Sequence, residues 1–180
     1  MASVESQCFT SPLVFTFAIV GHRAIDQARV GALGDRITRL IDSVGSQLGS
    51  AQAVSSIDQC RRLTLRFLSA LAPGADQIGA RAMLDRQARA KEGEAAWKLE
   101  AVLPFALEDY AHEIALDIRK RGGSTGEQEQ AAQAMRELAC KARRVLEVGD
   151  WMPGGGNPAL DEHYRARRYA TLGQMIVRQA

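Results

Sequence analysis

The feature that most constrains the fold is the alternation of short apolar runs with amphipathic helical patterns. The run LVFTFAIV, from Leu13 to Val20, is rich in aromatic and β-branched residues and ends at Gly21, which is typical of a strand buried on both faces of a parallel sheet. Apolar residues then recur at helical spacing from about Asp26 to Leu48, which predicts an amphipathic helix. The first run is far shorter than the roughly 20 residues of a membrane helix, and no basic segment precedes it. We therefore interpret it as a strand, and predict no membrane segment and no export signal.

The same alternation continues to the end of the chain. Arg121 to Gln130 is polar and rich in glycine, and it predicts an exposed, mobile loop. The other predicted elements are a strand at LTLRFLSAL from Leu63, a helix at GADQIGARAMLDRQARA, a strand at LEAVLPF from Leu99, a helix at LEDYAHEIALDIRK from Leu107, a helix over about 130–141, a short strand at RRVLEV and a last helix over about 160–177.

Strands that alternate with helices, joined by connections long enough for right-handed crossovers, predict an α/β fold. We expect a Rossmann-like three-layer αβα sandwich with an open, mostly parallel sheet. A chain of 180 residues fits one domain, which we assign to residues 13–180 after an N-terminal segment at 1–12. The sequence ends as a helix finishes, where the alternation calls for another strand. A complete small domain and a truncated chain are both open at this point.

Composition excludes some classes of partner. The 23 basic and 21 acidic residues give a net charge of +2, which is too balanced to predict binding of nucleic acid or of a membrane surface. Cys8, Cys60 and Cys140 are widely spaced and match neither a disulfide framework nor a CxxC half-site, so we predict free thiols and a cytoplasmic location. No pattern predicts a cofactor or a metal ligand set.

Candidate ligand-binding residues follow the first two strands, because ligands of open parallel sheets bind at the carboxyl ends of the strands. Gly21 permits a tight turn after the first strand, and His22 and Arg23 offer donors suited to a phosphate or carboxylate. Gly74 and Ala75 are small enough to let a ligand approach the free amides at a helix N-terminus.

Each of these residues also has a purely structural interpretation. Asp76, in the first helical turn, would either cap the helix or accept a hydrogen bond from a ribose hydroxyl. A glycine after a strand commonly just makes a turn, and a single histidine is commonly neither catalyst nor ligand. The RARR cluster from Arg165 is expected to be a solvated helix face.

The segments FAIVGHRAID, LRFLSALAPGADQIGARAML and LEAVLPFALEDYAHEI, taken together, resemble the SLOG superfamily of Rossmann-like domains, which includes the LOG and DprA-like proteins. The similarity runs from about Phe15 to the C-terminus. It implies binding of a nucleotide or a nucleotide-derived signal of ADP-ribose type, in the sensor part of a larger bacterial, sometimes defence-related, protein with a fused or associated effector. We also expect a homo-oligomer. The ligand-binding residues that follow from these segments and from the last helix are Gly21, His22, Arg23, Ser69, Gly74, Ala75, Asp76, Pro104 and Tyr164.

Two points of this assignment stay open. Related sequences continue into another strand and a Gly-Gly-Thr phosphate loop, neither of which is present here, and this favours truncation. Tyr164 could stack on a ligand or hydrogen-bond to it, but packing of Tyr164 or Tyr169 on the sheet is the alternative use of either ring.

The stretch WMPGGGNPALDEHY resembles the LOG pattern Pro-Gly-Gly-x-Gly-Thr-x-x-Glu only in part. Asn157 and Pro158 stand where the pattern has Gly and Thr, and Pro158 offers neither a hydroxyl nor an N–H to a phosphate. We interpret the stretch as a loop that leads into the last helix. The alternative is a nucleotide N-glycoside hydrolase, a phosphoribohydrolase, in which Asp161 and Glu162 are the catalytic acids.

Overall fold

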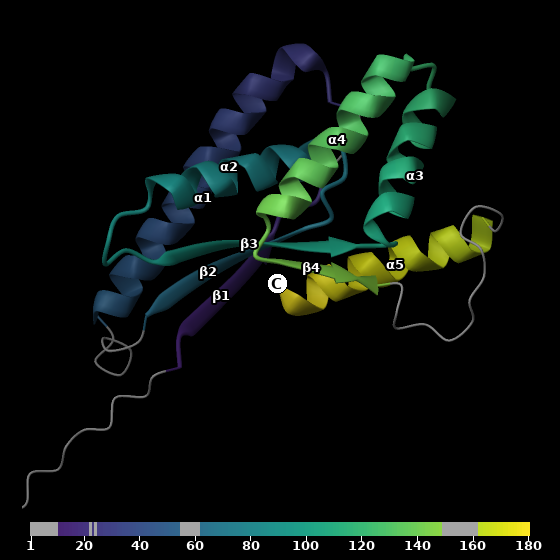
Figure 1. Cartoon of the computed structure of the whole chain (residues 1–180). Helices are drawn as coiled ribbons and strands as arrows, with labels where there is room; N and C mark the ends of the chain where they lie inside the picture. The colour runs from purple at the N-terminus through teal and green to yellow at the C-terminus, as the bar shows by residue number, and fades with distance from the viewer. Residues whose placement is uncertain (1–10, 22, 24, 55–61, 149–161) are drawn as a thin grey trace, which may run out of the picture.

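The computed structural model describes residues 11–21, 23, 25–54, 62–148 and 162–180. It confirms the predicted fold class, a Rossmann-like α/β fold in which helices lie on both sides of a parallel sheet (Figure 1). The described residues form four strands, β1 (Leu13–Ala18), β2 (Leu63–Ser69), β3 (Ala96–Leu103) and β4 (Arg144–Glu147), in the spatial order β1-β2-β3-β4, and every neighbouring pair is parallel. The helices are α1 (Gln27–Val54), α2 (Ala75–Arg89), α3 (Leu107–Lys120), α4 (Thr125–Lys141) and α5 (Glu162–Gln179).

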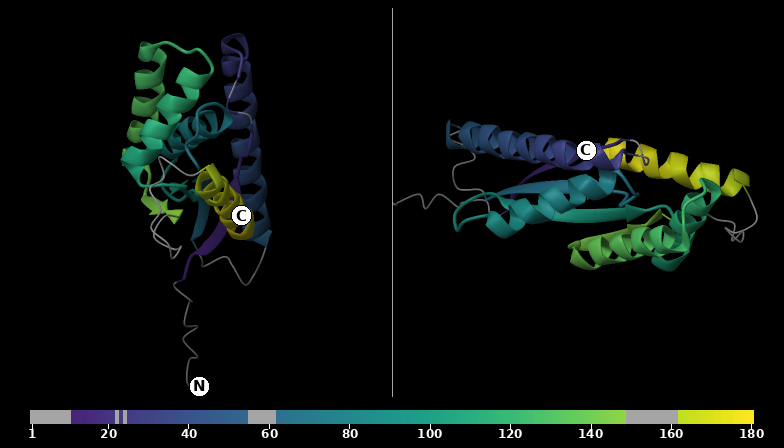
Figure 2. Two further views of the ribbon diagram at one scale, coloured as in Figure 1. Left: turned by 90° about the vertical axis from the view of Figure 1, so that its right-hand side faces the viewer. Right: turned by 90° about the horizontal axis from the view of Figure 1, so that it is seen from above.

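The two faces of the sheet carry separate apolar clusters, because successive side chains of a strand point to opposite faces. Leu65, Phe67 and Leu99 belong to the larger cluster, which includes buried residues of α1, α2, α3 and α4. Leu68 and Val102 belong to the smaller cluster, which packs against α5. Figure 2 shows α4 and α5 on opposite sides of the strands. The predicted three layers are therefore present, with α5 alone on the second face among the described helices.

The first strand differs from its prediction in one respect. Val14 and Phe15 are 47% and 41% exposed, whereas β2 is buried along almost its whole length. The reason is position, since β1 pairs only with β2 among the described strands and so forms an edge of the sheet. The apolar, β-branched run therefore predicted a strand correctly, but the prediction that both faces of this strand are buried is wrong.

The predicted loop at Arg121–Gln130 is wrong for its second half, because α4 already begins at Thr125. The Ser124 hydroxyl accepts a hydrogen bond from the Glu127 amide at 3.3 Å, and the Ser124 amide donates to the Glu127 carboxylate at 2.7 Å. This reciprocal pair is a capping box, which satisfies free amides at a helix start. The Ser-x-x-Glu spacing was visible in the sequence, but the surrounding glycines and polar residues outweighed it.

Helix α1 packs closely on β3 at a glycine. A Cβ atom on Gly45 would lie 2.5 Å from the ring of Trp97, whereas a Cβ atom on Gly49, one helical turn later, would meet nothing within 4 Å. The Trp97 ring also contacts Arg86 of α2, whose guanidinium lies 4.9 Å from the ring centroid. The absence of a side chain at Gly45 therefore lets α1 approach the sheet.

We expect Gly45→Ala to lower the free energy of unfolding by about 1–3 kcal/mol, because the new methyl group overlaps the Trp97 ring. Gly49→Ala is the matched control, and it should raise stability by about 0.5–1 kcal/mol through helix propensity alone. Urea unfolding of both variants measures the two effects. Equal shifts of the same sign would contradict the close approach.

Among the described residues, no helix combines the length and the apolar character that a membrane span requires.

Candidate functional site

The turn after β1 and the start of α2 touch each other. A Cβ atom on Gly21 would lie 2.6 Å from the Cβ atom of Ala75, so only a glycine permits this approach. The contact follows from the sheet, because β1 and β2 are parallel neighbours and their carboxyl ends lie at the same edge. The structure therefore brings together two of the segments in which the sequence predicted ligand-binding residues.

The turn between β2 and α2 leaves the start of the helix without a side-chain cap. Gly74 is the N-cap residue, with φ 93° and ψ −132°, a conformation that side chains disfavour, and no side chain caps this helix. Free amides of the first turn are the partial positive charge that attracts anions to a helix start.

Polar side chains fix the shape of this turn. The Ser69 hydroxyl accepts a hydrogen bond from the Leu71 amide at 3.1 Å and donates to the Asp76 carbonyl at 3.3 Å. The Gln77 side-chain amide donates to the Leu71 carbonyl at 3.1 Å. Leu71 has φ 55°, which is rare for a residue with a side chain. Ser69 is buried, and its hydroxyl supports the turn.

Asp76 turns away from the helix start, toward the preceding loop. Burial raises the pKa of its carboxyl to about 6, against the opposing effects of the Ala72 and Ala70 amides and of Arg23. It does not cap α2, because no side chain accepts a hydrogen bond at that N-terminus. Of the two uses predicted for Asp76, the helix cap is therefore wrong, and contact with a ribose hydroxyl stays a prediction.

Arg23 is held between α3 and α5. Its guanidinium lies 3.6 Å from the Asp117 carboxylate and 4.9 Å from the ring centroid of Tyr169. Asp117 also pairs with Arg121, one helical turn later on α3. One carboxylate thus holds two guanidinium groups, and about a third of each side chain in the Arg23–Asp117 pair is exposed.

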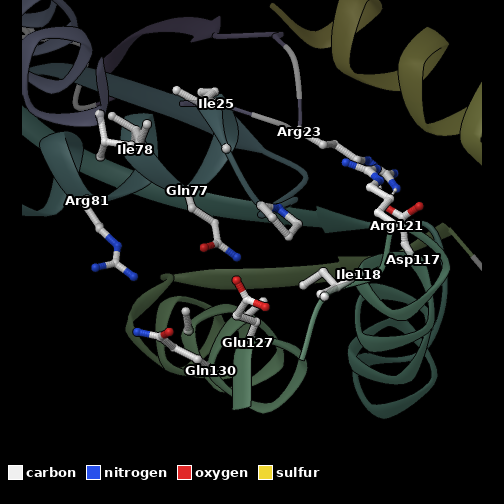
Figure 3. A pocket seen from close by; sticks show the side chains of 16 residues that line it. Arg23, Ile25, Gln77, Ile78, Arg81, Asp117, Ile118, Arg121, Glu127 and Gln130 are labelled. Atoms are coloured by element: carbon white, nitrogen blue, oxygen red, sulfur yellow. Dashed lines mark hydrogen bonds and ion pairs between the residues drawn. The ribbon is translucent and has the colours of Figure 1, made fainter. Parts of the chain in front are cut away.

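A hollow of about 470 Å³ opens beside this pair, between α2, α3 and α4 (Figure 3). In the figure Arg23, Asp117 and Arg121 lie at one end and Arg81 at the other, with Gln77 between them. Apolar side chains form part of the wall. The full lining is Arg23, Ile25, Val30, Pro73, Gly74, Gln77, Ile78, Arg81, Asp117, Ile118, Arg121, Gly123, Glu127, Gln130, Ala131 and Ala134.

The lining carries three arginines against two carboxylates, and both carboxylates are already engaged. Asp117 pairs with Arg23 and Arg121, and Glu127 accepts hydrogen bonds from Ser124. Arg81 is exposed and makes no ion pair with any described residue. The hollow therefore has a surplus of positive charge.

A second hollow of about 160 Å³, between α3 and α5, also includes Arg23 and Asp117 in its lining. Tyr169 and Arg165 of α5 line it, and Arg165 pairs with the Glu113 carboxylate of α3. The Arg23–Asp117 pair thus lines both hollows.

The remaining predicted residues lie elsewhere. Pro104 is buried at the end of β3 and lines neither hollow. Tyr164 packs on the sheet side of α5, with its ring centroid 6.5 Å from that of Phe105, and it accepts a hydrogen bond from Arg168. Glu162 is exposed in the first turn of α5. His22 and Asp161 lie outside the described residues, as do the glycines of the WMPGGGNPALDEHY stretch, Cys8 and Cys60.

The interpretation of the RARR cluster as a solvated face is wrong for two of its arginines. Arg168 is only 5% exposed, and Arg165 is in its ion pair with Glu113. Their spacing explains this, because positions 165, 168, 169 and 172 fall on one face of α5, which also carries the buried Leu172. The long side chains of Arg165 and Arg168 therefore extend the buried face of α5, which includes Leu172, toward the start of the helix.

Sequence reasoning missed Gln77, Arg81, Asp117 and Arg121. Gln77 and Arg81 lie four residues apart on α2, on the helix face that also carries Gly74, so helical spacing could have grouped them with the predicted site. Asp117 and Arg121 have the same spacing on α3, but their place beside Arg23 depends on how α3 packs. No local sequence pattern predicts this packing of α3.

Comparison with known proteins gives no relative: no family model, no curated protein and no solved structure matches this chain. The resemblance to the SLOG superfamily therefore stays a prediction that rests on the three quoted segments.

Proposed function

We propose that this protein binds a nucleotide or a nucleotide-derived signal of ADP-ribose type in the hollow between α2, α3 and α4. The observation that carries the proposal is that Arg23, which follows β1, and Gly74, which starts α2, line the same hollow. Its volume of about 470 Å³ lies within the usual range for small-molecule sites, roughly 300–1,000 Å³. A site at the carboxyl ends of parallel strands fits the usual location of ligands in this fold class.

The charges favour a ligand that has both phosphates and an apolar part. A phosphate would bind to Arg23 and Arg121 near the uncapped start of α2, and would replace the Asp117 carboxylate there. The apolar wall that includes Ile25 and Ile78 suits a base, and Arg81 at the far end suits a second anionic group. Such a ligand would supply the anionic partner that the surplus arginine of the hollow lacks.

Calorimetry with ADP-ribose, NAD, AMP and cyclic nucleotides tests the proposal directly. We expect heat of binding from at least one of these ligands, with an affinity that weakens as salt is added, because ion pairs are screened. If no nucleotide gives heat at any salt concentration, the proposal fails.

We propose a cytoplasmic homo-oligomer with a fused or associated effector, and the free, exposed thiol of Cys140 supports a reducing compartment. Size-exclusion chromatography with light scattering tests self-association. The hydrolase alternative gains no support from Glu162, whose side chain is exposed.

A further inference from the structure

The smaller hollow, between α3 and α5, is lined mainly by charged side chains. Three of them are cations, Arg23, Lys120 and Arg165, and two are carboxylates, Glu113 and Asp117. The volume of about 160 Å³ lies below the roughly 300–1,000 Å³ of sites that hold a whole small molecule. The hollow therefore suits one small group, and its surplus of positive charge favours an anion.

The two carboxylates of this hollow already have partners, whereas its cations keep free donors. Asp117 pairs with Arg23. Both oxygens of Glu113 accept hydrogen bonds from one nitrogen of Arg165, Nη2, and among the described residues no other group accepts from this guanidinium. Lys120 is exposed and forms no ion pair with any described residue. The lining thus has donors for one further anion.

Arg23 lines both hollows, and the other cations beside it divide between them. Arg121 lines only the larger hollow, while Lys120 and Arg165 line only the smaller one. A guanidinium carries five N–H donors in a planar fork, so one arginine can bind two neighbouring anionic groups. Two anions that bind the same arginine in this way are close to each other, as the two phosphates of a diphosphate are.

We propose that the ligand is a nucleoside diphosphate or a derivative of one, and that its diphosphate spans Arg23, with one phosphate in each hollow. The inference rests on the proposed function and narrows its ligand class, because a nucleoside monophosphate supplies no anion to the smaller hollow. The second phosphate contacts Lys120 and Arg165 there. Since Lys120 is exposed, a group attached to this phosphate can extend into solvent.

Calorimetry on the full chain with AMP and with ADP, in buffer that contains EDTA, tests the inference, because the two ligands differ by one phosphate. We expect wild type to bind ADP about 10- to 100-fold more tightly than AMP, the value of one hydrogen bond between charged groups. Lys120→Gln should weaken ADP binding by about tenfold and leave AMP binding as in wild type. The position is exposed, so the variant should fold as wild type does.

Lys141→Gln is the matched control, because it makes the same change at an exposed position of α4 that lines neither hollow. It should keep the wild-type preference for ADP. If it loses as much of this preference as Lys120→Gln does, net charge explains the effect and the inference fails.

The remaining outcomes separate the inference from the proposed function. If wild type binds AMP and ADP with equal affinity, or if Lys120→Gln keeps the full preference for ADP, the inference fails while the proposed function stands. If wild type gives no heat with any nucleotide, both fail.

Discussion

Wild type should lose unfolding free energy between pH 4 and pH 7.5 through the buried Asp76 carboxyl, and Asp76→Asn should remove most of this pH dependence. Compared with wild type, the variant should therefore be relatively more stable at pH 7.5 than at pH 4. Burial raises the pKa of the Asp76 carboxyl from 3.8 to about 6 in the folded state. The folded protein therefore holds this proton more tightly than the unfolded chain does. The resulting stabilisation is fully present below pH 3.8, is lost as the pH rises to about 6, and stays absent above it.

The expected size of the effect is large for one side chain. A rise from 3.8 to about 6 corresponds to at most about 3 kcal/mol of unfolding free energy across this window. Urea unfolding at several pH values between 4 and 7.5 measures it, as the difference between wild type and Asp76→Asn. Asp85→Asn, at an exposed position of the same helix, is the matched control and should keep the wild-type profile. Parallel profiles for wild type and Asp76→Asn would show that the buried carboxyl does not titrate in this window.

Arg23→Gln should weaken nucleotide binding by about 10- to 100-fold, since a hydrogen bond to a charged group contributes about 1.5–3 kcal/mol. Its effect on stability should be small, below about 1 kcal/mol, because the Arg23–Asp117 pair is long and about a third exposed. Calorimetry gives the affinity, and urea unfolding gives the stability of the same samples.

The control for Arg23→Gln is Arg39→Gln, which makes the same change of charge at an exposed position of α1 away from the hollow. It should leave nucleotide affinity close to that of wild type. If both variants weaken binding equally, the ligand responds to the net charge of the protein rather than to Arg23.

Local patterns predicted the helices and strands well where residue type and spacing agree. Helix α3 has the predicted bounds, Leu107–Lys120, because Pro104 and a glycine pair at 122–123 delimit it. Strand β3 begins at Ala96, before the predicted Leu99, and α1 continues to Val54, beyond the predicted Leu48. Trp97, in the part of β3 that precedes Leu99, contacts α1 at Gly45 and Arg86 of α2, and only tertiary structure supplies these contacts.

The candidate site was predictable only where it lies on strand ends. Gly21, Arg23 and Gly74 could be grouped, because a general rule places ligands at the carboxyl ends of parallel strands. Asp117 and Arg121 could not be, because only the packing of α3 places Asp117 beside Arg23. Arg168 was misassigned for a similar reason, since a charged residue on a buried helix face contradicts the usual pattern.

The shared carboxylate of Asp117 has a consequence for selectivity. Because Asp117 already occupies Arg23 and Arg121, it is a built-in competitor for any anion that approaches them. We expect chloride, acetate and other simple monoanions to gain almost nothing at this site, since they offer the arginines no more than the carboxylate does. A ligand must bring greater charge or additional contacts to displace it. The site would then leave common small anions unbound and bind only ligands that offer the arginines more charge or more contacts than the Asp117 carboxylate does.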